Sequence, residues 1–573
     1  MAFQLSPGVN VSEIDLTTIV PAVGTTEGAY IGRFQWGPIN DIVTISNEIE
    51  LAATFGKPDN NTFIDFFTAA NFLAYARNLK LVRVANTSIA NNATSGSQNV
   101  LIKNNDQYLT EYSDLSANGL IGMFAAKYAG ELGNSLKVSV YANTINTTVT
   151  SWNAATWTYA SEFDGPPATS VYATNVNGKN DEMHLIVIDE DGVFSGRANT
   201  ILEKFAFISK ASDAKNDDGS SNYYVNVIND RSQYIYILNK ALNGNGAANT
   251  TTWGLSAANT TFAQGLPEYT ASLSGGVSGA VTDGDRILGY DLFSNADETD
   301  VSLFMTGAAN TTVAQAVIDL AETRKDAVAF VSPEFADVVN NAGDEADDII
   351  DRRNTLNRST SYAVMDSAWK YQFDKYNNVY RWVPMNGDIA GLCVRTDFER
   401  DPWFSPAGFN RGQIRNVVKL SYNPNKTDRD ELYKNGVNPV VTFRGEGTIL
   451  YGDKTLLARP SAFDRINVRR LFIVLEKAIA RAAKFSLFEF NDEFTRSQFV
   501  ALVDPFLRDV QGRRGIFDYR VVCDETNNTP EIIDRNEFVG DIYIKPARSI
   551  NFIQLNFIAV RTGVAFEEIV GRF

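Results

Sequence analysis

The stretch that most constrains this chain is its last fifth, residues 455–573, because its apolar residues recur with a regular helical period. Asp464 is predicted to be the N-cap of a helix that runs to about residue 485. Apolar residues at intervals of three and four predict its buried stripe: Leu471, Val474, Leu475, Ala478, Ala482 and Phe485. Basic residues fall in a narrow sector on another side of this helix: Arg470, Lys477, Arg481 and Lys484. One face is therefore expected to join a core, and the other presents a row of positive charge.

A second helix is predicted from about Phe494, and Pro505 is expected to kink it or to restart it. A short strand is predicted at 521–523, followed by a hairpin of residues 541–545 and 550–560. The apolar residues of this hairpin are candidates for a sheet that accepts further strands: Ile542, Ile544, Ile553, Leu555 and Phe557. Because a two-stranded hairpin is marginally stable alone, we expect it to need additional strands.

Both ends of the chain carry short segments typical of strands. Residues 7–16 alternate apolar and polar side chains, with one phase slip that suits a bulge, and residues 564–570 are also β-prone. The apolar positions are Val9, Val11, Ile14 and Leu16 at the start, and Val564, Phe566 and Ile569 at the end. Such segments can pair within the chain or add to a sheet edge on a neighbouring chain, and composition does not choose between these.

The middle of the chain is predicted to be a layered α/β domain interrupted by a β-rich insertion. Strand and helix patterns alternate in residues 23–85, with a helix cap at Ser46, and return in 281–454, with a cap at Thr311 or Thr312. Residues 86–280 are instead rich in Asn, Thr, Ser, Ala and Gly, with short alternating segments and polar turns. We therefore expect an α+β multidomain fold: a discontinuous core domain, an inserted domain at 86–280, a C-terminal α+β domain at 455–561, and extended arms at 1–22 and 562–573.

Residue types that support chemistry are scarce. His184 is the only histidine, and Cys393 and Cys523 are the only cysteines, which argues against Ser-His-Asp triads and Cys or His zinc sites. No Gly-x-x-x-x-Gly-Lys-Ser/Thr motif for a nucleotide phosphate occurs. We assign no catalytic, cofactor-binding or metal-binding residues and expect a protein that is not an enzyme.

The charge of the chain is unevenly distributed. Residues 455–573 hold 17 Lys and Arg against 16 Asp and Glu, so the net charge of −17 leaves −18 for residues 1–454. Nonspecific binding to nucleic acid or to anionic membranes is therefore not expected. Residues 1–4 lack a basic or apolar leader, and no apolar run is long enough to span a membrane, so we expect a soluble chain made in the cytoplasm.

Several short motifs, none specific by itself, occur in a defined order along the chain. Those of the core are VPMNGDIAG at 383–391, RTD at 395–397, DPWFSPAG at 401–408, GVNP at 436–439 and YGDKTL at 451–456. Others are PGV at 7–9, residues 32–38, FG at 55–56 and NVRRL at 467–471. Taken together and in this order, the motifs resemble those of the tail sheath proteins of contractile bacteriophage tails. The resemblance covers the whole chain except residues 86–280, which in that family are variable and face outward.

The resemblance implies a structural subunit that stacks as hexameric rings around a tail tube, in an extended lattice that collapses to a shorter, wider one. It implies that the C-terminal domain faces the tube and that both arms complete the sheet of a neighbouring subunit by strand exchange. The basic row then becomes a candidate tube-facing surface, although a solvated helix face with local ion pairs explains it about equally well. The implied partners are the chain itself, the tube protein, and baseplate and terminator proteins, in the virion tail after assembly in the host cytoplasm. No cofactor is implied.

Two other functions remain open from the sequence. A sheath of a phage-derived contractile injection system, such as a tailocin, would have the same mechanism without genome delivery, and neighbouring capsid and terminase genes would separate the two. A glycan-binding host-recognition protein is a more distant alternative, with Trp152, Trp157 and Trp253 as the aromatic residues of the insertion.

Overall fold

The computed structural model describes residues 26–113, 122–142, 152, 157–238, 252–263, 269–551 and 554. The chain divides into two compact units. The larger contains residues 22–401 and 406–469, and the smaller includes residues 402–405 and the chain from 470 onward. The predicted arms, 1–22 and 562–573, lie outside the described residues.

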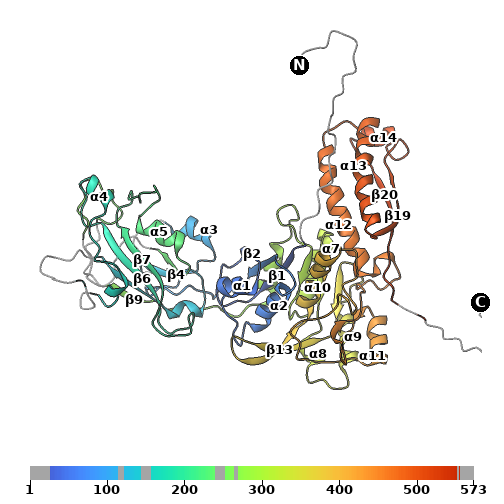
Figure 1. The fold of residues 1–573 in the computed structure, drawn as a ribbon, viewed down its shortest axis with the longest axis horizontal. Helices are drawn as coiled ribbons and strands as arrows, with labels where there is room; N and C mark the ends of the chain where they lie inside the picture. Colours follow the sequence, from blue (N-terminus) through green and yellow to red (C-terminus); the bar gives the residue numbers. More distant parts are fainter. Residues whose placement is uncertain are drawn as a thin grey trace, which may run out of the picture. The chain divides into compact units, whose positions relative to one another are not determined.

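A seven-stranded sheet forms the centre of the larger unit (Figure 1). Its order is β16 (Val437–Asn438), β12 (Ala363–Asp366), β11 (Val328–Val331), β10 (Leu303–Met305), β1 (Gly28–Gly32), β3 (Leu79–Arg83) and β2 (Ile42–Ile45), and only β2 is antiparallel to its neighbour. β1 pairs directly with β10, so residues on both sides of the insertion share one sheet. Apart from the edge strand β2, the strands are short, mostly apolar and almost fully buried, as expected for a parallel sheet covered on both faces.

Helices cover the two faces of this sheet. On one face α2 (Phe63–Leu73) and α10 (Asn386–Glu399) pack together, and on the other α6 (Asp283–Asp291) packs beside α7 (Thr311–Arg324). Alternate residues of β1 face these layers: Ala29 and Ile31 join the core with α7, whereas Tyr30 donates a hydrogen bond to Asp65 of α2. The remaining helices are α1 (Glu48–Phe55), α8 (Phe335–Val338), α9 (Glu345–Thr355) and α11 (Lys426–Lys434).

Two predicted helix caps are wrong by one or two residues. Asn47, rather than Ser46, accepts from the backbone N–H of Glu50, and Asn310, rather than Thr311 or Thr312, accepts from that of Val313. Each Asn has the extended backbone that an N-cap requires, whereas Thr311 already lies within α7.

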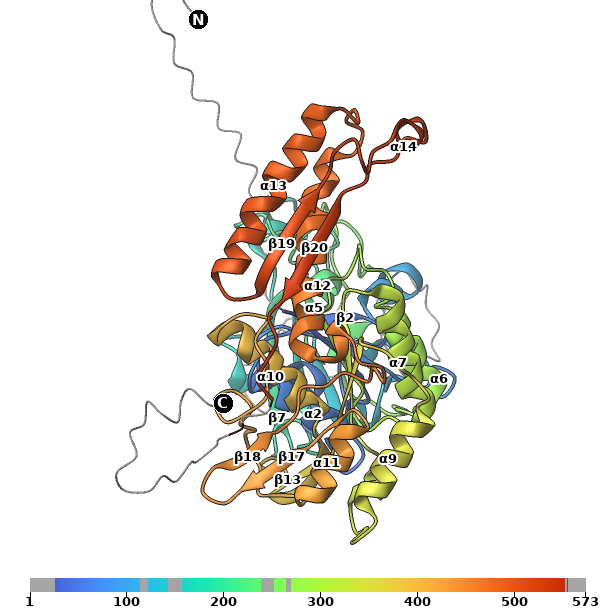
Figure 2. The ribbon, with the colours of Figure 1, turned by 90° about the vertical axis from the view of Figure 1, so that its right-hand side faces the viewer.

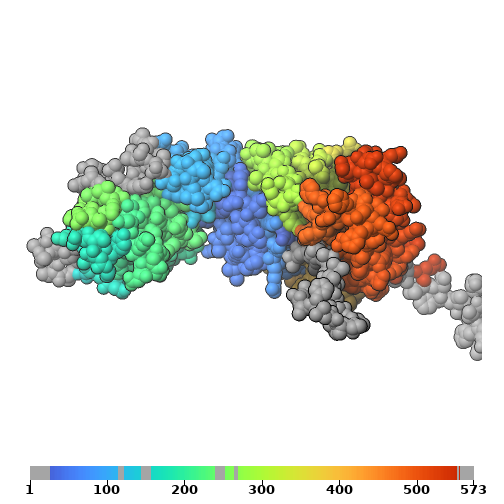
Figure 3. Space-filling model, turned by 90° about the horizontal axis from the view of Figure 1, so that it is seen from above, coloured from blue at the N-terminus to red at the C-terminus, as the bar shows by residue number. Residues whose placement is uncertain are grey.

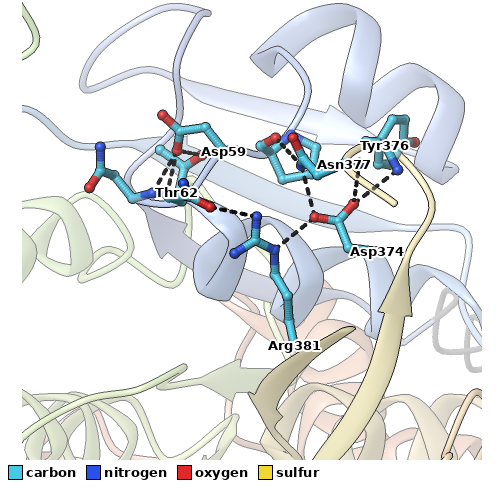
Figure 4. A network of polar contacts seen from close by, with 9 residues as sticks. Asp59, Thr62, Asp374, Tyr376, Asn377 and Arg381 are labelled. Atoms are coloured by element: carbon cyan, nitrogen blue, oxygen red, sulfur yellow. Dashed lines mark hydrogen bonds and ion pairs between the residues drawn. The ribbon is translucent and has the colours of Figure 1, made fainter. Parts of the chain in front are cut away.

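A hairpin beside the sheet is held to the turn before α2 by a polar network (Figure 4). The hairpin is β13 (Trp369–Asp374) with β14 (Val379–Pro384), and β15 (Lys419–Leu420) extends it. Asp374 accepts from the backbone N–H of Tyr376 at 2.9 Å and from Arg381 Nε at 2.8 Å. Arg381 Nη2 also donates to Asn60 at 2.8 Å. A second hairpin joins β17 (Val440–Phe443) and β18 (Gly447–Leu450).

The insertion is β-rich, as predicted, and has its own core. Its main sheet is antiparallel in the order β7 (Thr200–Ser209), β6 (Glu182–Asp189), β5 (Leu136–Tyr141) and β9 (Tyr269–Ser272). β4 (Phe124–Ala126) pairs with β8 (Ile235–Ile237), and the helices are α3 (Asn105–Gln107), α4 (Val171–Asn175) and α5 (Tyr224–Arg231). The described residues of the insertion occupy the left of Figure 3, in blue to light green. Trp157 is 1% and Trp253 7% exposed, so neither offers the open aromatic face that a glycan-binding surface needs.

The smaller unit packs two long helices against two strands (Figure 2). They are α12 (Ile466–Ala483), α13 (Glu493–Gly512), β19 (Ile516–Val522) and β20 (Asp541–Pro546), with the short α14 (Pro530–Asp534) between the strands. The predicted stripe of α12 is confirmed at Leu471, Leu475, Ala478 and Ala482, which are at most 2% exposed.

Three details of this unit differ from the sequence prediction. Asp464 lies in a separate 3-10 turn, and α12 begins at Ile466. Phe485 is 77% exposed because α12 ends at Ala483, before the stripe is complete. Of the two effects predicted for Pro505, the restart does not occur, since α13 continues through it, and the kink stays a prediction.

Candidate assembly surfaces

The sheet of the smaller unit presents one apolar and one exposed face. Ile542 and Ile544 of β20, two residues of the predicted acceptor sheet, pack against the cluster formed by α12 and α13. The intervening Tyr543 is 60% exposed, and Phe517 on β19 is 71% exposed. The alternation of the strand therefore fixes its orientation on the helices and leaves aromatic side chains on the outer face.

This sheet has only two strands in the part of the chain that the structure describes. β19 and β20 are antiparallel, with Tyr519 opposite Ile544 and Val521 opposite Ile542. The sequence also predicted a hairpin of residues 541–545 with 550–560. Of the second segment only 550, 551 and 554 are described, so this pairing stays a prediction. Among the described residues each strand thus has one paired edge and one edge with no strand beside it. An open edge exposes backbone N–H and C=O groups that another strand can bind.

The other predicted strand residues lie outside the described part of the chain. These are Val9, Val11, Ile14, Leu16, Ile553, Leu555, Phe557, Val564, Phe566 and Ile569. Their role in strand exchange stays a prediction.

The predicted basic row on α12 does not have uniform exposure. Arg470 is 4% exposed, Lys477 is half-buried, and Arg481 and Lys484 are exposed. Lys484 follows the helix, in a 3-10 turn over Lys484–Ser486. A surface that could meet another protein is therefore limited to Lys477, Arg481 and Lys484.

The turn between α12 and α13 exposes a group of large apolar side chains that the sequence analysis missed. Phe488 is 105% exposed and has a positive φ of 70°. Its exposed neighbours are Phe485 (77%), Leu487 (63%), Phe490 (83%) and Phe494 (72%). The detectable signal was four Phe within ten residues, two of which the sequence analysis placed at the ends of helices. Exposed apolar side chains gathered in this way make the turn a candidate interaction surface.

His184 and the pair of Lys370 and Asp388 are ionisable groups buried inside the larger unit. His184 is buried on β6, its Nε2 lies 2.9 Å from Gly165 O, its Nδ1 accepts from the Phe207 N–H, and burial lowers its pKa to about 4. Lys370 Nζ lies 2.9 Å from Asp388 Oδ1, and both side chains are buried. Among the described residues no group of three or more His, Cys, Asp and Glu could hold a metal ion, and no helix is long and apolar enough to cross a membrane.

Comparison with known proteins places the chain among virus tail components. Three family models match it: "Tail sheath protein Gp18 domain III N-terminal region" at residues 28–84, "Phage tail sheath protein central domain" at 298–456 and "Phage tail sheath C-terminal domain" at 458–559. The chain is 34% identical to the tail sheath protein of Vibrio phage KVP40, with 99% of this chain and 100% of that one aligned. It is also 34% identical to the tail sheath protein of Enterobacteria phage T4, with 99% of each aligned.

A solved structure shares the fold. The sheath tail protein Lin1278 from Listeria innocua superposes with a TM-score of 0.53 over 92% of this chain and 93% of that one, at 12% identity. The class is therefore that of structural proteins of the virion, the components of a contractile tail. The chain belongs to the family of phage tail sheath proteins.

Proposed function

We propose that this chain polymerises as stacked hexameric rings around a tail tube and contracts from an extended lattice to a shorter, wider one. Contraction would drive the tube through the host envelope and allow the genome to leave the virion. The observation that carries this proposal is the two-stranded sheet of the smaller unit, with an open edge on each described strand, in a member of the sheath family. The energy would be stored in the assembled lattice, since the sequence has no P-loop motif for a nucleotide.

The arms would connect subunits. Residues 9–16 and 564–569 of neighbouring copies would add as strands beside β19 and β20, in the mode of β-strand addition. Main-chain hydrogen bonds of this type do not depend on the side-chain interfaces between rings. They can therefore persist while those interfaces slide and repack during contraction.

The tube-facing surface would be the exposed part of the basic row, Lys477, Arg481 and Lys484, against an acidic tube. Arg470 does not belong to it because its side chain is buried. Ion pairs of exposed side chains contribute roughly 0.2–1 kcal/mol each and weaken with salt, so they would hold the tube collectively without locking it. The exposed Phe485, Phe488 and Phe490 would supply apolar contacts between subunits in the assembled sheath.

Electron microscopy of truncated chains tests the role of the arms. The full-length protein is compared with variants lacking residues 1–20, residues 562–573, or both, each checked for folding by circular dichroism. We expect tubes or rings from the full-length chain and folded, unassembled protein from the double truncation. If the double truncation assembles as well as the full-length chain, the arms are not the connectors.

Substitutions in the turn between α12 and α13 provide an independent test. Replacing Phe485, Phe488 and Phe490 together with Ser should leave the fold intact, because all three side chains are more than 75% exposed. Assembly should fall strongly. A matched control replaces Phe398, which is 93% exposed in the larger unit, with Ser. This control should assemble normally if the loss of assembly is specific to the turn. If both variants assemble equally well, this turn is not part of an interface between subunits.

The same proposal sets partners and location. The mature protein would lie in the virion tail, in contact with other copies, the tube protein, and the baseplate and terminator proteins at the ends of the sheath. Assembly would take place in the host cytoplasm. We propose no contact with nucleic acid or membrane, in keeping with the net charge of −17.

A further inference from the structure

A basic pocket in the larger unit has no role in the function proposed above. It has a volume of about 580 Å³ and lies between the C-terminal ends of α9 and α11 and the segment 454–464. Its charged lining consists of Arg353, Arg358, Lys434, Lys454, Arg459 and Asp464. Five cations thus gather with one carboxylate, in a chain whose net charge is −17.

The ends of two helices explain why cations lie at the walls of this pocket. Arg353 is in the last turn of α9 and Lys434 in that of α11, where the unpaired carbonyls carry partial negative charge. Arg353 Nη2 donates to Leu456 O at 2.8 Å, and Lys454 Nζ donates to Tyr433 O at 2.7 Å. These hydrogen bonds fix two of the side chains in place, but carbonyl groups do not neutralise full charges.

Carboxylates balance only part of the positive charge of the pocket. Arg358 forms a two-point contact with Asp319 at 2.9 and 3.0 Å, and Asp464 lies 3.9 Å from Arg465. The structure shows no ion pair for Arg353, Lys434, Lys454 or Arg459 with any residue it describes. Burying a cation without a counter-charge is costly.

Arg353 is the most deeply buried of the cations that line the pocket. Its side chain is only 9% exposed, and its Nε has no hydrogen-bond partner. Burial lowers the pKa of Arg353. The pKa of Lys454 is also lowered, by burial and by the nearby Arg465, although Asp464 and Asp453 oppose this shift. An anion in the pocket would offset these penalties, because it stabilises the charged form of each group.

We propose that this pocket binds an oxyanion, either a phosphate or a carboxylate group, with Arg353 and Lys454 at its wall and Lys434 and Arg459 at its rim. A guanidinium suits this role because its N–H groups match the two oxygens of such an anion. The anion has two possible sources: free phosphate, or the carboxylate of an Asp or Glu side chain on a second copy of this chain. The chain contains 68 Asp and Glu, so a second copy offers many such groups.

The first experiment measures the binding of inorganic phosphate to unassembled protein by calorimetry, at constant ionic strength with chloride as the reference anion. The rim variant Lys434→Gln with Arg459→Gln should weaken phosphate binding at least about tenfold, the effect of losing one or two charged hydrogen bonds. Both side chains are exposed, so this variant should fold normally. The matched control is Lys426→Gln, an exposed cation at the opposite end of α11, which should bind as the wild type does.

Two results would overturn the proposal. Either the wild type binds phosphate no more tightly than chloride, or the rim variant binds phosphate as tightly as the wild type and the Lys426 control.

A second experiment distinguishes the two sources of the anion. Unlike the first experiment, it rests on the proposed self-assembly. If the anion is a carboxylate of a second copy, assembled tubes should no longer bind phosphate. Phosphate should then slow assembly of the wild type but not of the rim variant. If the anion is free phosphate, assembled and unassembled protein should bind it with the same affinity. A chain that binds phosphate but never assembles would contradict the proposed function and leave the pocket assignment intact.

Discussion

Arg83 forms buried hydrogen bonds with both the core and the insertion. It is 1% exposed at the end of β3, and its guanidinium donates to the backbone carbonyls of Phe34 at 3.0 Å and Gly37 at 2.8 Å. It also donates to Ala129 of the insertion at 2.6 Å. Replacing Arg83 with Met leaves these buried acceptors without a donor, at about 1–3 kcal/mol each. We expect the free energy of unfolding in urea to fall by at least about 3 kcal/mol.

The matched variant is Arg83→Lys, which keeps the charge but has a single nitrogen to donate. Its stability should lie between those of the wild type and Arg83→Met. A Met variant within about 0.5 kcal/mol of the wild type would show that these carbonyls find other donors.

Asp366 should make the larger unit less stable as pH rises. It is buried on β12, accepts from Ser332 Oγ at 2.6 Å, and burial raises its pKa from 3.8 to about 7. Between these two values the folded chain keeps a proton that the unfolded chain releases. Stability is therefore fully present below pH 3.8 and is lost as pH rises through about 7, by roughly 4 kcal/mol.

The variant Asp366→Asn removes this titration, so its urea denaturation should show a smaller loss of stability between pH 4 and pH 7 than the wild type. His184 has the opposite effect, because its folded pKa of about 4 lies below its usual 6.5 and stability rises with pH across that interval. Both proteins contain His184, so the difference between them reports Asp366. Parallel pH profiles would show that Asp366 is ionised in the folded chain at pH 5.

Among the elements, α13 contains a proline that lowers its stability. Pro505 lies inside this 20-residue helix on an exposed surface, and proline provides no N–H for the carbonyl four residues earlier. Replacing Pro505 with Ala restores that hydrogen bond and should stabilise the smaller unit by about 1–3 kcal/mol. Hydrogen exchange of the amides in α13 measures the effect as slower exchange. Faster exchange would mean that the ring of Pro505 makes a packing contact more valuable than the hydrogen bond.

The sequence predicted elements well where the signal was local. The period of three and four along α12 predicted its buried stripe, and alternating strand and helix patterns were predicted in 23–85 and 281–454, the two segments that supply the seven-stranded sheet. It failed where tertiary structure decides. Phe485 fits the stripe, but the helix ends first, and Arg470 lies in the basic sector but is covered by the fold. The pairing of β20 with β19, across an intervening helix, was not predicted, because side-chain alternation does not encode a non-local partner.

The candidate sites were predictable to a similar extent. The strand of Ile542 and Ile544 was predicted because apolar residues alternate along it, and the structure places both side chains against the helices, while their role as acceptors stays a prediction. The exposed turn at Phe488 and the pocket at Arg353 were not identified. In the sequence, the Phe and Leu residues of the turn are indistinguishable from residues of a buried core. The pocket brings together three segments that are separated in sequence.

At the scale of the whole molecule, the insertion enters and leaves the core at one place. Asn91 and Val277 lie opposite one another, joined by two backbone hydrogen bonds of 2.9 and 3.0 Å. Residues 92–276 could therefore be replaced by an Asn-Gly turn, which suits two antiparallel segments joined by a pair of hydrogen bonds. Trp36, which packs edge-on against Tyr128 and Phe194 of the insertion, would become exposed and should be changed to Ser in the same variant.

We expect this shortened chain to fold and to form tubes, because none of the described strands of the seven-stranded sheet or of the smaller unit comes from residues 92–276. It should be less stable than the full-length protein, since Arg83 loses its bond to Ala129 and Ile39 loses its backbone bond to Lys103. Circular dichroism checks folding, and electron microscopy beside the full-length chain checks assembly. A folded variant that stays monomeric would place an essential subunit contact on the insertion. The proposed division of labour, in which the arms and the smaller unit connect the lattice, would then be wrong.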